Sequence, residues 1–281
     1  MKSFDQRVVV VTGAASGIGR SLAVQLARQG ASLALADMNA EGLAETKTLV
    51  EAAAGFCTTH ELDVADREGF EAFASQVIAD HGEVHVVFNN AGVTLVDSVE
   101  SQSYEDFNWL MNINFWGVVY GTRAFLPYLK QVDEAHIVNV SSVFGILAVP
   151  LQSAYNASKF AVRGFTESLK MELAGSHINV SCVHPGGIKT GIAQNSRMNE
   201  ETLGAPQEQL TAEFDAMART TADKAAAIMI RGVLKNKRRI MVGTDAKIMS
   251  LVTRLFPGSY ERLLGIEKRV RERRKALSYG V

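Results

Sequence analysis

Cysteine and proline are scarce in this sequence, and both absences narrow the class of protein. The 281 residues include two cysteines, Cys57 and Cys182, and five prolines, while 47% of the residues are hydrophobic. So few cysteines argue against a disulfide scaffold, and so few prolines in a hydrophobic chain argue against a disordered or collagen-like protein. The cysteines lie far apart in apolar, strand-like surroundings, which predicts buried thiols in a reducing compartment.

Net charge and long apolar runs are also missing. Lys and Arg number 29 against 30 Asp and Glu, which leaves a formal charge of -1 and no global positive field for binding nucleic acid. No apolar run reaches about 18 residues, the length needed to span a membrane. Residues 1–7 are polar and lack the pattern of a signal peptide. We therefore expect a cytoplasmic protein that does not bind nucleic acid.

Short apolar segments alternate with amphipathic ones along most of the chain. Strands are predicted at residues 8–11, 32–36, 56–62, 84–88, 135–140, 178–183 and 239–242. Helices are predicted at residues 16–29, 40–53, 67–79, 104–129, 154–173 and 222–234. Because parallel strands need crossovers that cover the faces of the sheet, this alternation predicts an α/β fold. The expected architecture is a single-domain, doubly wound parallel sheet of the Rossmann type with helices on both faces.

The domain organisation follows from where this alternation weakens. Residues 1–244 are predicted to form one domain, because no independent second set of elements is visible. Within it, residues 191–221 mix Gln, Asn, Glu, Thr and Met, which predicts a mobile flap with helical pieces. Residues 245–281 are predicted to form a helical C-terminal extension.

A glycine-rich turn follows the first predicted strand. Gly13, Gly17 and Gly19 permit a tight turn and the close approach of a phosphate. The helix that starts next, around Ser16 and Ile18, would direct its N-terminus at that anion. The spacing G-x-x-x-G-x-G is by itself equally compatible with a structural connection.

Asp37, at the end of the second predicted strand, favours a dinucleotide at this turn. It follows Gly19 by eighteen positions, where a carboxylate can accept hydrogen bonds from the adenosine ribose. The alternative is that Asp37 caps the next helix, although Asn39 could supply that cap. The carboxylate would repel the 2′-phosphate of NADP, and neither Ser16 nor Met38 offers a compensating cation. The sequence therefore favours NAD.

Tyr155 and Lys159 are the candidate acid-base pair. They stand four positions apart on a predicted helix, so they share a face, and the Lys charge would favour the phenolate of a Tyr whose ordinary pKa is about 10. Ser142 follows the strand at 135–140 and would lie at the carboxyl edge of the sheet, where it could hold a substrate oxygen. Ser141 is the alternative if the strand end is shifted, and an exposed Tyr-Lys pair without function is the alternative for the helix.

In their order and spacing these motifs resemble the short-chain dehydrogenase/reductase family over residues 8–190, roughly two thirds of the chain. The resemblance implies that Ser142 rather than Ser141 is catalytic. It also implies that Asn114 distorts its helix and holds a water that relays protons towards Lys159; on its own, Asn114 reads only as an unfavourable mid-helix residue. The cofactor contacts that it implies are Gly13, Ser16, Gly17, Ile18, Gly19, Asp37, Asp63, Val64, Asn90, Ala91, Gly92, Tyr155, Lys159, Pro185, Gly186, Ile188 and Thr190.

Taken together, the motifs predict an NAD-dependent oxidoreductase that interconverts a secondary alcohol and a ketone, with residues 1–244 as its dinucleotide-binding and catalytic domain. Tyr155 would transfer the substrate proton while Ser142 steadies the carbonyl and a hydride moves to or from the nicotinamide. An NADP-dependent carbonyl or 3-oxoacyl-thioester reductase is an alternative that Asp37 disfavours. A non-catalytic nucleotide-sensing protein is another, disfavoured because Lys159 and Asn114 accompany Ser142 and Tyr155.

The remaining features concern ligands and partners. Six histidines are scattered without companions at metal-ligand spacing, so no metal is predicted. Apolar residues at 93–96, after Ser142 and around the flap favour a lipophilic small-molecule substrate, although core packing explains the loop after Ser142 equally well. The physiological substrate, reaction direction and stereochemistry stay open. The family resemblance implies a homodimer or homotetramer.

The C-terminal extension combines an apolar stripe with a basic segment. Apolar residues recur at helical spacing from Ile248 to Phe256, and residues 262–275 carry seven cations against two acids. Such an end could rest on a membrane. Because Glu267 and Glu272 interrupt the charge, packing against the chain's own domain or a neighbouring subunit is favoured.

Overall fold

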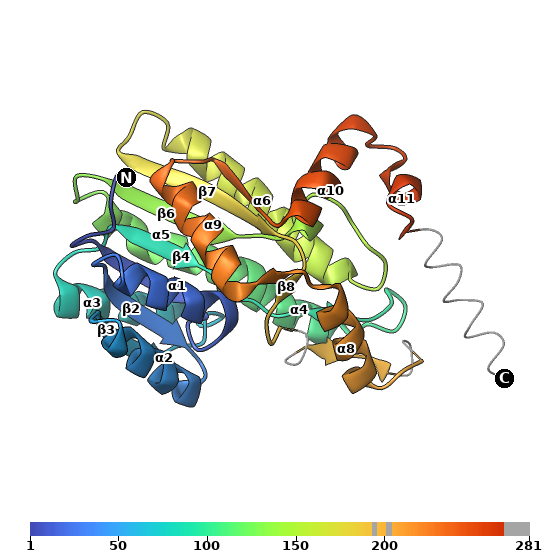
Figure 1. Ribbon diagram of the computed structural model, residues 1–281, viewed down its shortest axis with the longest axis horizontal. Helices are drawn as coiled ribbons and strands as arrows, with labels where there is room; N and C mark the ends of the chain where they lie inside the picture. Colours follow the sequence, from blue (N-terminus) through green and yellow to red (C-terminus); the bar gives the residue numbers. More distant parts are fainter. Residues whose placement is uncertain (193–195, 201–203, 267–281) are drawn as a thin grey trace.

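A seven-stranded sheet forms the centre of the protein (Figure 1). The computed structural model describes residues 1–192, 196–200 and 204–266. All neighbouring strands of the sheet are parallel, in the order β11-β7-β6-β4-β1-β2-β3. The strands are β1 (Val8–Thr12), β2 (Ser32–Asp37), β3 (Phe56–Glu61), β4 (Val86–Asn89), β6 (Ala135–Val140), β7 (Ile178–Pro185) and β11 (Arg239–Val242).

Helices cover both faces of this sheet, because its β-branched strands are apolar on both sides. On one face, Val9 and Val11 belong to a core that includes Leu22 and Met229. The helices of that face are α1 (Gly17–Ala27), α2 (Ala40–Ala52) and α9 (Ala222–Leu234). On the other face, Val10 belongs to a second core. Its helices are α3 (Arg67–His81), α5 (Gly117–Leu129) and α6 (Ser153–Glu172). The predicted doubly wound fold is confirmed.

The region predicted as helical over 104–129 is not one regular helix. It consists of α4 (Tyr104–Met111), a π-helical turn η1 (Asn112–Trp116) and α5. The π turn holds one more residue per turn than an α-helix. On the two sides of this turn, α4 and α5 bury their apolar side chains in different clusters, with Leu110 in one and Phe125 in another.

Two short strands in the predicted flap attach it to the rest of the fold. These are β9 (Arg197–Met198), which pairs with β5 (Leu95–Val96), and β10 (Thr220–Thr221), which pairs with β8 (Ile188–Lys189); α8 (Gln207–Met217) lies between β9 and β10. Arg197 also lies 3.9 Å from the centroid of the Trp109 ring and 2.6 Å from an Asp106 oxygen. Residues 193–195 and 201–203 lie outside the described residues, and the mobility of the flap stays a prediction.

The C-terminal extension begins with two helices, α10 (Thr244–Leu255) and α11 (Tyr260–Leu263). They pack on the 3-10 turn η2 (Val143–Gly145) and the loop behind it through a small apolar cluster. Two polar contacts fix their position: the Gly187 amide donates to Asp245 Oδ2 at 2.7 Å, and the Ala148 amide donates to the Tyr260 hydroxyl at 3.4 Å. No helix within the described part of the chain is long and apolar enough to cross a membrane. Most of the basic segment at 262–275 lies outside the described residues.

Two buried histidines in the sheet couple its stability to pH. His136 Nε2 is 2.7 Å from Ser181 Oγ, and His184 Nδ1 is 2.9 Å from the carbonyl oxygen of Ser142. Burial disfavours the imidazolium, so it lowers the pKa of His136 to about 3 and that of His184 to about 4.

We expect the free energy of unfolding to decrease as the pH falls below about 6.5, the ordinary pKa of both imidazoles. Below that pH the unfolded chain binds a proton at each imidazole, while the folded chain binds one at His184 only near pH 4. The stabilisation is therefore complete above the unfolded pKa and is lost as the pH falls through the folded value, by roughly 3 kcal/mol for His184. Urea denaturation across this range measures the slope. The variant His184→Gln should show a shallower slope, and a slope equal to that of the parent protein would contradict the assignment.

Candidate active site

A cleft of about 260 Å³ lies at the carboxyl edge of the sheet, beside β1 and β4, where the strand order reverses. In doubly wound sheets this is the position at which ligands bind. The predicted cofactor residues that line it are Gly13, Ser16, Gly17, Ile18, Gly19, Asp37, Asp63, Val64, Asn90, Ala91, Gly92 and Thr190. Further lining residues, which are not among the predicted cofactor contacts, are Met38, Leu62, Val93, Ile113, Gly191 and Ile192. The only sequence signal for most of them is that they adjoin a predicted residue.

The glycine turn is held in close contact with the loop that follows β4. Gly13 has a φ of +67°, and a Cβ atom there would lie 2.8 Å from the Cα of Ala91, so a larger residue would separate the two loops. Asn90 reinforces the contact, because its side-chain amide donates to the Thr12 carbonyl at 2.9 Å and its backbone amide donates to Thr12 Oγ1 at 3.0 Å. The floor of the cleft is therefore fixed by two crossing loops.

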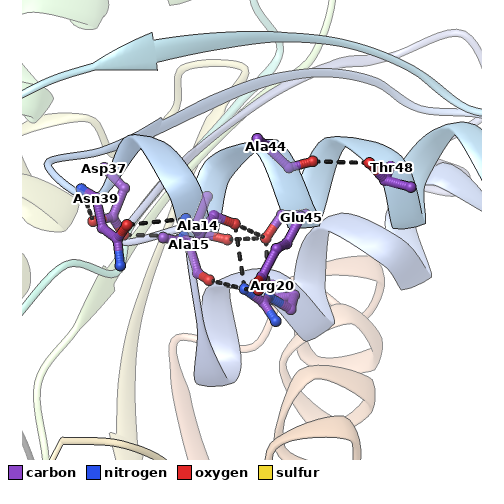
Figure 2. A network of polar contacts seen from close by, with 10 residues as sticks. Ala14, Ala15, Arg20, Asp37, Asn39, Ala44, Glu45 and Thr48 are labelled. Atoms are coloured by element: carbon purple, nitrogen blue, oxygen red, sulfur yellow. Dashed lines mark hydrogen bonds and ion pairs between the residues drawn. The ribbon is translucent and has the colours of Figure 1, made fainter.

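Asp37 is held at the rim of the cleft by two backbone amides (Figure 2). Its Oδ2 accepts from the Ala15 amide and its Oδ1 from the Asn39 amide, each at 3.0 Å. The cap of α2 is Asn39, whose side-chain oxygen accepts from the Gly42 amide at 2.9 Å. The alternative that Asp37 caps this helix is therefore excluded. Each carboxylate oxygen keeps capacity to accept a further hydrogen bond from a ligand.

Arg20 is the cation of α1 closest in sequence to the glycine turn, and its charge is matched elsewhere. Its guanidinium lies 2.6 Å from Glu45, donates to Thr46 Oγ1 at 3.0 Å and also donates to the Ala15 carbonyl. Figure 2 shows it across Ala15 from Asp37, and it does not line the cleft. Arg20 therefore leaves the negative charge of Asp37 facing the cleft.

The structure brings Ser142, Tyr155 and Lys159 together. The Tyr155 hydroxyl is hydrogen-bonded to the Ser142 side chain, and Lys159 Nζ lies 5.7 Å from the centroid of the Tyr155 ring. Ser142 Oγ also accepts from the Phe144 amide at 3.1 Å. The neighbouring hydroxyl of Ser141 has a different partner, because it donates to the Lys159 carbonyl at 2.7 Å. Of the two serines left open by the sequence, Ser142 is the one beside Tyr155.

Lys159 is buried, with 3% of its surface exposed. Its ammonium donates to the Val140 carbonyl at 3.2 Å, and a Cβ atom on Gly92 would lie 3.2 Å from Nζ. Glycine at position 92 thus leaves room for the ammonium between the end of β6 and the loop after β4. Burial lowers the pKa of Lys159 to about 8.

Burial also determines the protonation of Tyr155 in the chain by itself. It raises the pKa of the phenol above the ordinary value of 10.0, and the hydrogen bond with Ser142 opposes this only in part. The direction differs from the sequence-based expectation that Lys159 favours the phenolate, because desolvation of the anion is the largest influence on this pKa. At neutral pH Tyr155 is therefore a proton donor until a further positive charge lies beside it.

Asn114 occupies the centre of the π turn and is fully buried. Its side chain pairs with both backbone groups of Val93: Oδ1 accepts from the amide at 2.8 Å, and Nδ2 donates to the carbonyl at 2.9 Å. Nδ2 also lies 3.2 Å from Ser158 Oγ. These contacts stabilise an Asn at a position where the helix is interrupted, and they hold Val93 in the wall of the cleft.

His184 is a site residue that the sequence-based prediction missed. Its hydrogen bond to the Ser142 carbonyl fixes the backbone that carries the Ser142 hydroxyl, and Nε2 is buried without a partner among the described residues. In the sequence alone His184 resembles the other five histidines, because none of the six has companions at metal-ligand spacing. The available signal was its position immediately before Pro185-Gly186.

Five predicted cofactor residues do not line the cleft itself. Tyr155 and Lys159 lie in the cluster just described. Pro185 ends β7, Gly186 lies against the Asp245 carboxylate, and Ile188 is buried in the core. In the described residues no group of three His, Cys, Asp or Glu side chains could hold a metal ion.

Comparison with known proteins identifies relatives of this arrangement. A family model described as short chain dehydrogenase matches residues 7–201. A Mycobacterium tuberculosis protein named as an oxidoreductase, SadH, is 45% identical over 267 residues, which cover 94% of this chain and 96% of that protein. A 3-ketodihydrosphingosine reductase of Bacteroides thetaiotaomicron is 33% identical over 197 residues, covering 70% of this chain and 69% of the other.

Solved structures share the architecture as well. A short-chain dehydrogenase/reductase from Burkholderia phymatum in complex with NAD superposes with a TM-score of 0.84 at 30% identity, covering 90% of this chain and 95% of that one. Structures that match this chain hold NAD in some cases and an NADP derivative in others.

Proposed function

The chain belongs to the short-chain dehydrogenase family of oxidoreductases, and we propose that it interconverts a secondary alcohol and a ketone with NAD. The observation that carries this proposal is the placement of Tyr155, hydrogen-bonded to Ser142 and next to buried Lys159. A hydroxyl so placed can exchange a proton with a substrate oxygen. The adjoining cleft fits a dinucleotide, because it combines a glycine turn with the Asp37 carboxylate, which can accept hydrogen bonds from ribose hydroxyls.

In the oxidation direction, Tyr155 as the phenolate accepts the hydroxyl proton of the alcohol. The carbon–hydrogen bond breaks, the carbon–oxygen double bond forms, and the hydrogen leaves with its electron pair as a hydride. NAD, when bound, supplies the acceptor for that hydride and a positive charge near the phenol. Ser142 donates a hydrogen bond to the substrate oxygen, and Lys159 stabilises the phenolate. Asn114 acts through Val93 as a positioning residue, and reduction reverses these steps.

NAD is proposed over NADP because of the charge at the adenosine end of the cleft. Asp37 lies at the rim, and Arg20, which could have neutralised a 2′-phosphate, is paired with Glu45. A 2′-phosphate would therefore meet a carboxylate at short range without a compensating cation from α1.

A lipophilic substrate is proposed because apolar side chains surround the reacting hydroxyl. The Phe144 ring meets the Tyr155 ring edge-on at 6.2 Å between centroids, and Leu95 and Trp109 belong to the same apolar cluster as Tyr155. The similarity to a protein whose name specifies a keto sphingoid lipid agrees with this substrate class. Walls of this kind bind apolar groups and exclude water from the site.

The proposal also includes a cytoplasmic location and assembly into a homo-oligomer. Cys57 and Cys182 are buried free thiols, as expected in the reducing cytoplasm. Trp116 and Phe160 are partly exposed on η1 and α6. A neighbouring subunit would cover these large apolar side chains, which supports a homodimer or homotetramer built on these helices.

The variant Tyr155→Phe should lose turnover while NAD still binds. The change removes the proton-transferring oxygen and leaves the ring that packs against Phe144. NADH absorbance across a panel of sterol-like, acyl and sugar-derived alcohols and ketones measures turnover, and fluorescence titration measures NAD binding. Tyr104→Phe, at an exposed tyrosine on α4, is the matched control. Undiminished turnover in Tyr155→Phe would refute the assigned role, and NAD binding without turnover of any compound by the parent protein would favour a nucleotide sensor.

Adjacent serines should give opposite phenotypes. We expect Ser142→Ala to lower kcat by about 10²- to 10³-fold with little loss of stability, because it removes a donor to the substrate oxygen. Ser141→Ala should instead lower the free energy of unfolding by about 0.5 to 1.5 kcal/mol, because it removes the hydrogen bond that ties the loop after β6 to the Lys159 carbonyl of α6. Steady-state kinetics and urea denaturation of both variants separate the two effects, and a larger kinetic effect at Ser141 would reverse the assignment.

Cofactor choice should depend on Asp37. The parent protein is expected to bind NAD more tightly than NADP. Asp37→Asn should weaken NAD binding, because the carboxylate that accepts from the ribose is lost. It should also reduce the ratio of NADP to NAD dissociation constants, because the repulsion of a 2′-phosphate is removed. Competitive titration with both nucleotides measures this preference, with Asp63→Asn as a control for a second carboxylate in the cleft. Tighter NADP binding by the parent protein would overturn the cofactor proposal.

A further inference from the structure

The outward side of α10 is an apolar stripe bordered by cations. Ile248, Leu251 and Leu255 are 54%, 58% and 61% exposed and recur at helical spacing. Lys247 and Arg254 are exposed on the same helix. We call these five residues the α10 outer face.

The opposite side of the helix is fixed against the domain. Asp245, the single carboxylate of α10, accepts the Gly187 amide, and Ala246 is fully buried. Met249 packs in the cluster below, and Tyr260 of α11 accepts the Ala148 amide. With its inner side anchored at these points, α10 cannot rotate to bury the α10 outer face within its own domain.

Charge is distributed unevenly between this extension and the rest of the chain. Residues 245–281 carry nine Lys and Arg against four Asp and Glu, whereas residues 1–244 carry twenty against twenty-six. The overall charge of -1 conceals a positive extension on a negative domain. A positive segment next to an exposed apolar stripe is complementary to a surface that is apolar inside and anionic at its boundary.

We propose that the α10 outer face is a docking surface for an anionic lipid bilayer, with α10 lying in the plane of the headgroups. Ile248, Leu251 and Leu255 would enter the acyl boundary while Lys247 and Arg254 contact lipid phosphates. A second copy of the chain fits this face less well, because a two-fold contact would bring Lys247 and Arg254 of both copies together. The bilayer satisfies both the apolar and the electrostatic character of the surface.

The position of this face deepens the proposed function and, in this respect, rests on it. Figure 1 shows α10 and α11 at the end of the molecule that also holds α4 and α8, away from α2 and α3. Phe144 packs in the cluster beneath α10 and α11 and also contacts the ring of Tyr155. Docking through the α10 outer face would therefore bring the substrate side of the site towards the bilayer, the source of a lipophilic alcohol or ketone.

Vesicle co-sedimentation with the full-length chain tests the docking surface without relying on enzyme activity. The protein should sediment with vesicles of phosphatidylcholine and phosphatidylglycerol in equal amounts, and much less with phosphatidylcholine alone. Leu251→Ser combined with Leu255→Ser should weaken binding by at least about tenfold, and Lys247→Glu combined with Arg254→Glu should weaken it as well. The matched control is Leu49→Ser combined with Met171→Ser, two exposed apolar residues on α2 and α6, which should bind like the parent protein.

Several results would overturn the proposal. Equal binding by the Leu251→Ser/Leu255→Ser variant, or equal binding of the parent protein to neutral vesicles, would refute docking by this face on anionic lipid. A drop in molar mass of that variant in light scattering, with no change in vesicle binding, would assign the face to a second copy. Thermal melting of each variant shows whether the fold is retained, as expected for exposed positions.

The same variants keep this proposal separable from the proposed function. Leu251→Ser/Leu255→Ser should turn over a soluble substrate at the parent rate without vesicles. Tyr155→Phe should lose turnover yet sediment with anionic vesicles like the parent protein. Loss of turnover without loss of docking, or the reverse, therefore identifies which of the two proposals fails.

Discussion

Burying the ammonium of Lys159 is the constraint around which the site is built. Removing such a cation from water costs several kcal/mol unless acceptors replace the solvent. The end of β6 supplies one such acceptor, the Val140 carbonyl, which accepts from Nζ. The next two residues fix the surroundings of the ammonium, because the Ser141 hydroxyl donates to the Lys159 carbonyl and Ser142 contacts Tyr155. These contacts hold α6 against the end of β6 and position the side chains of Tyr155 and Lys159. The lowered pKa of Lys159 is the part of the desolvation cost that these contacts leave uncompensated.

Much of this architecture was predictable because its causes are local. The valines of β1 at Val8 to Val11 and the glycines after them specify a strand and a tight turn without information from elsewhere in the chain. Asp37 could be placed because a strand end fixes its distance from the turn. The π turn could not be predicted, because helical periodicity over 104–129 does not reveal one extra residue. The role of Asn114 is predicted only by the family resemblance. Its cause is a pair of hydrogen bonds to Val93, twenty-one positions earlier.

Other features depend on contacts between distant segments and leave little trace in the sequence. His184 meets Ser142 only because β6 and β7 are neighbours in the sheet. The apolar stripe of α10 was visible as a pattern, but the pattern could not show that Met249 turns inwards while Leu251 and Leu255 stay exposed. That division is decided by Asp245 and Tyr260, whose partners lie after β7 and after β6. The predicted packing of the extension on its own domain is seen for the inner side of the helix, and packing of the outer side on a neighbouring subunit stays a prediction.

The π turn also has a consequence for how this chain can change length. Deleting one residue between Asn112 and Trp116 would let ordinary α-helical hydrogen bonds close, but it would turn α4 by about 100° relative to α5. Leu110 would then leave the cluster it shares with Leu95 and Ala154 while Phe125 kept its place in another. The length of this segment therefore fixes the rotation of α4 relative to α5. Selection should remove insertions and deletions here far more strictly than substitutions.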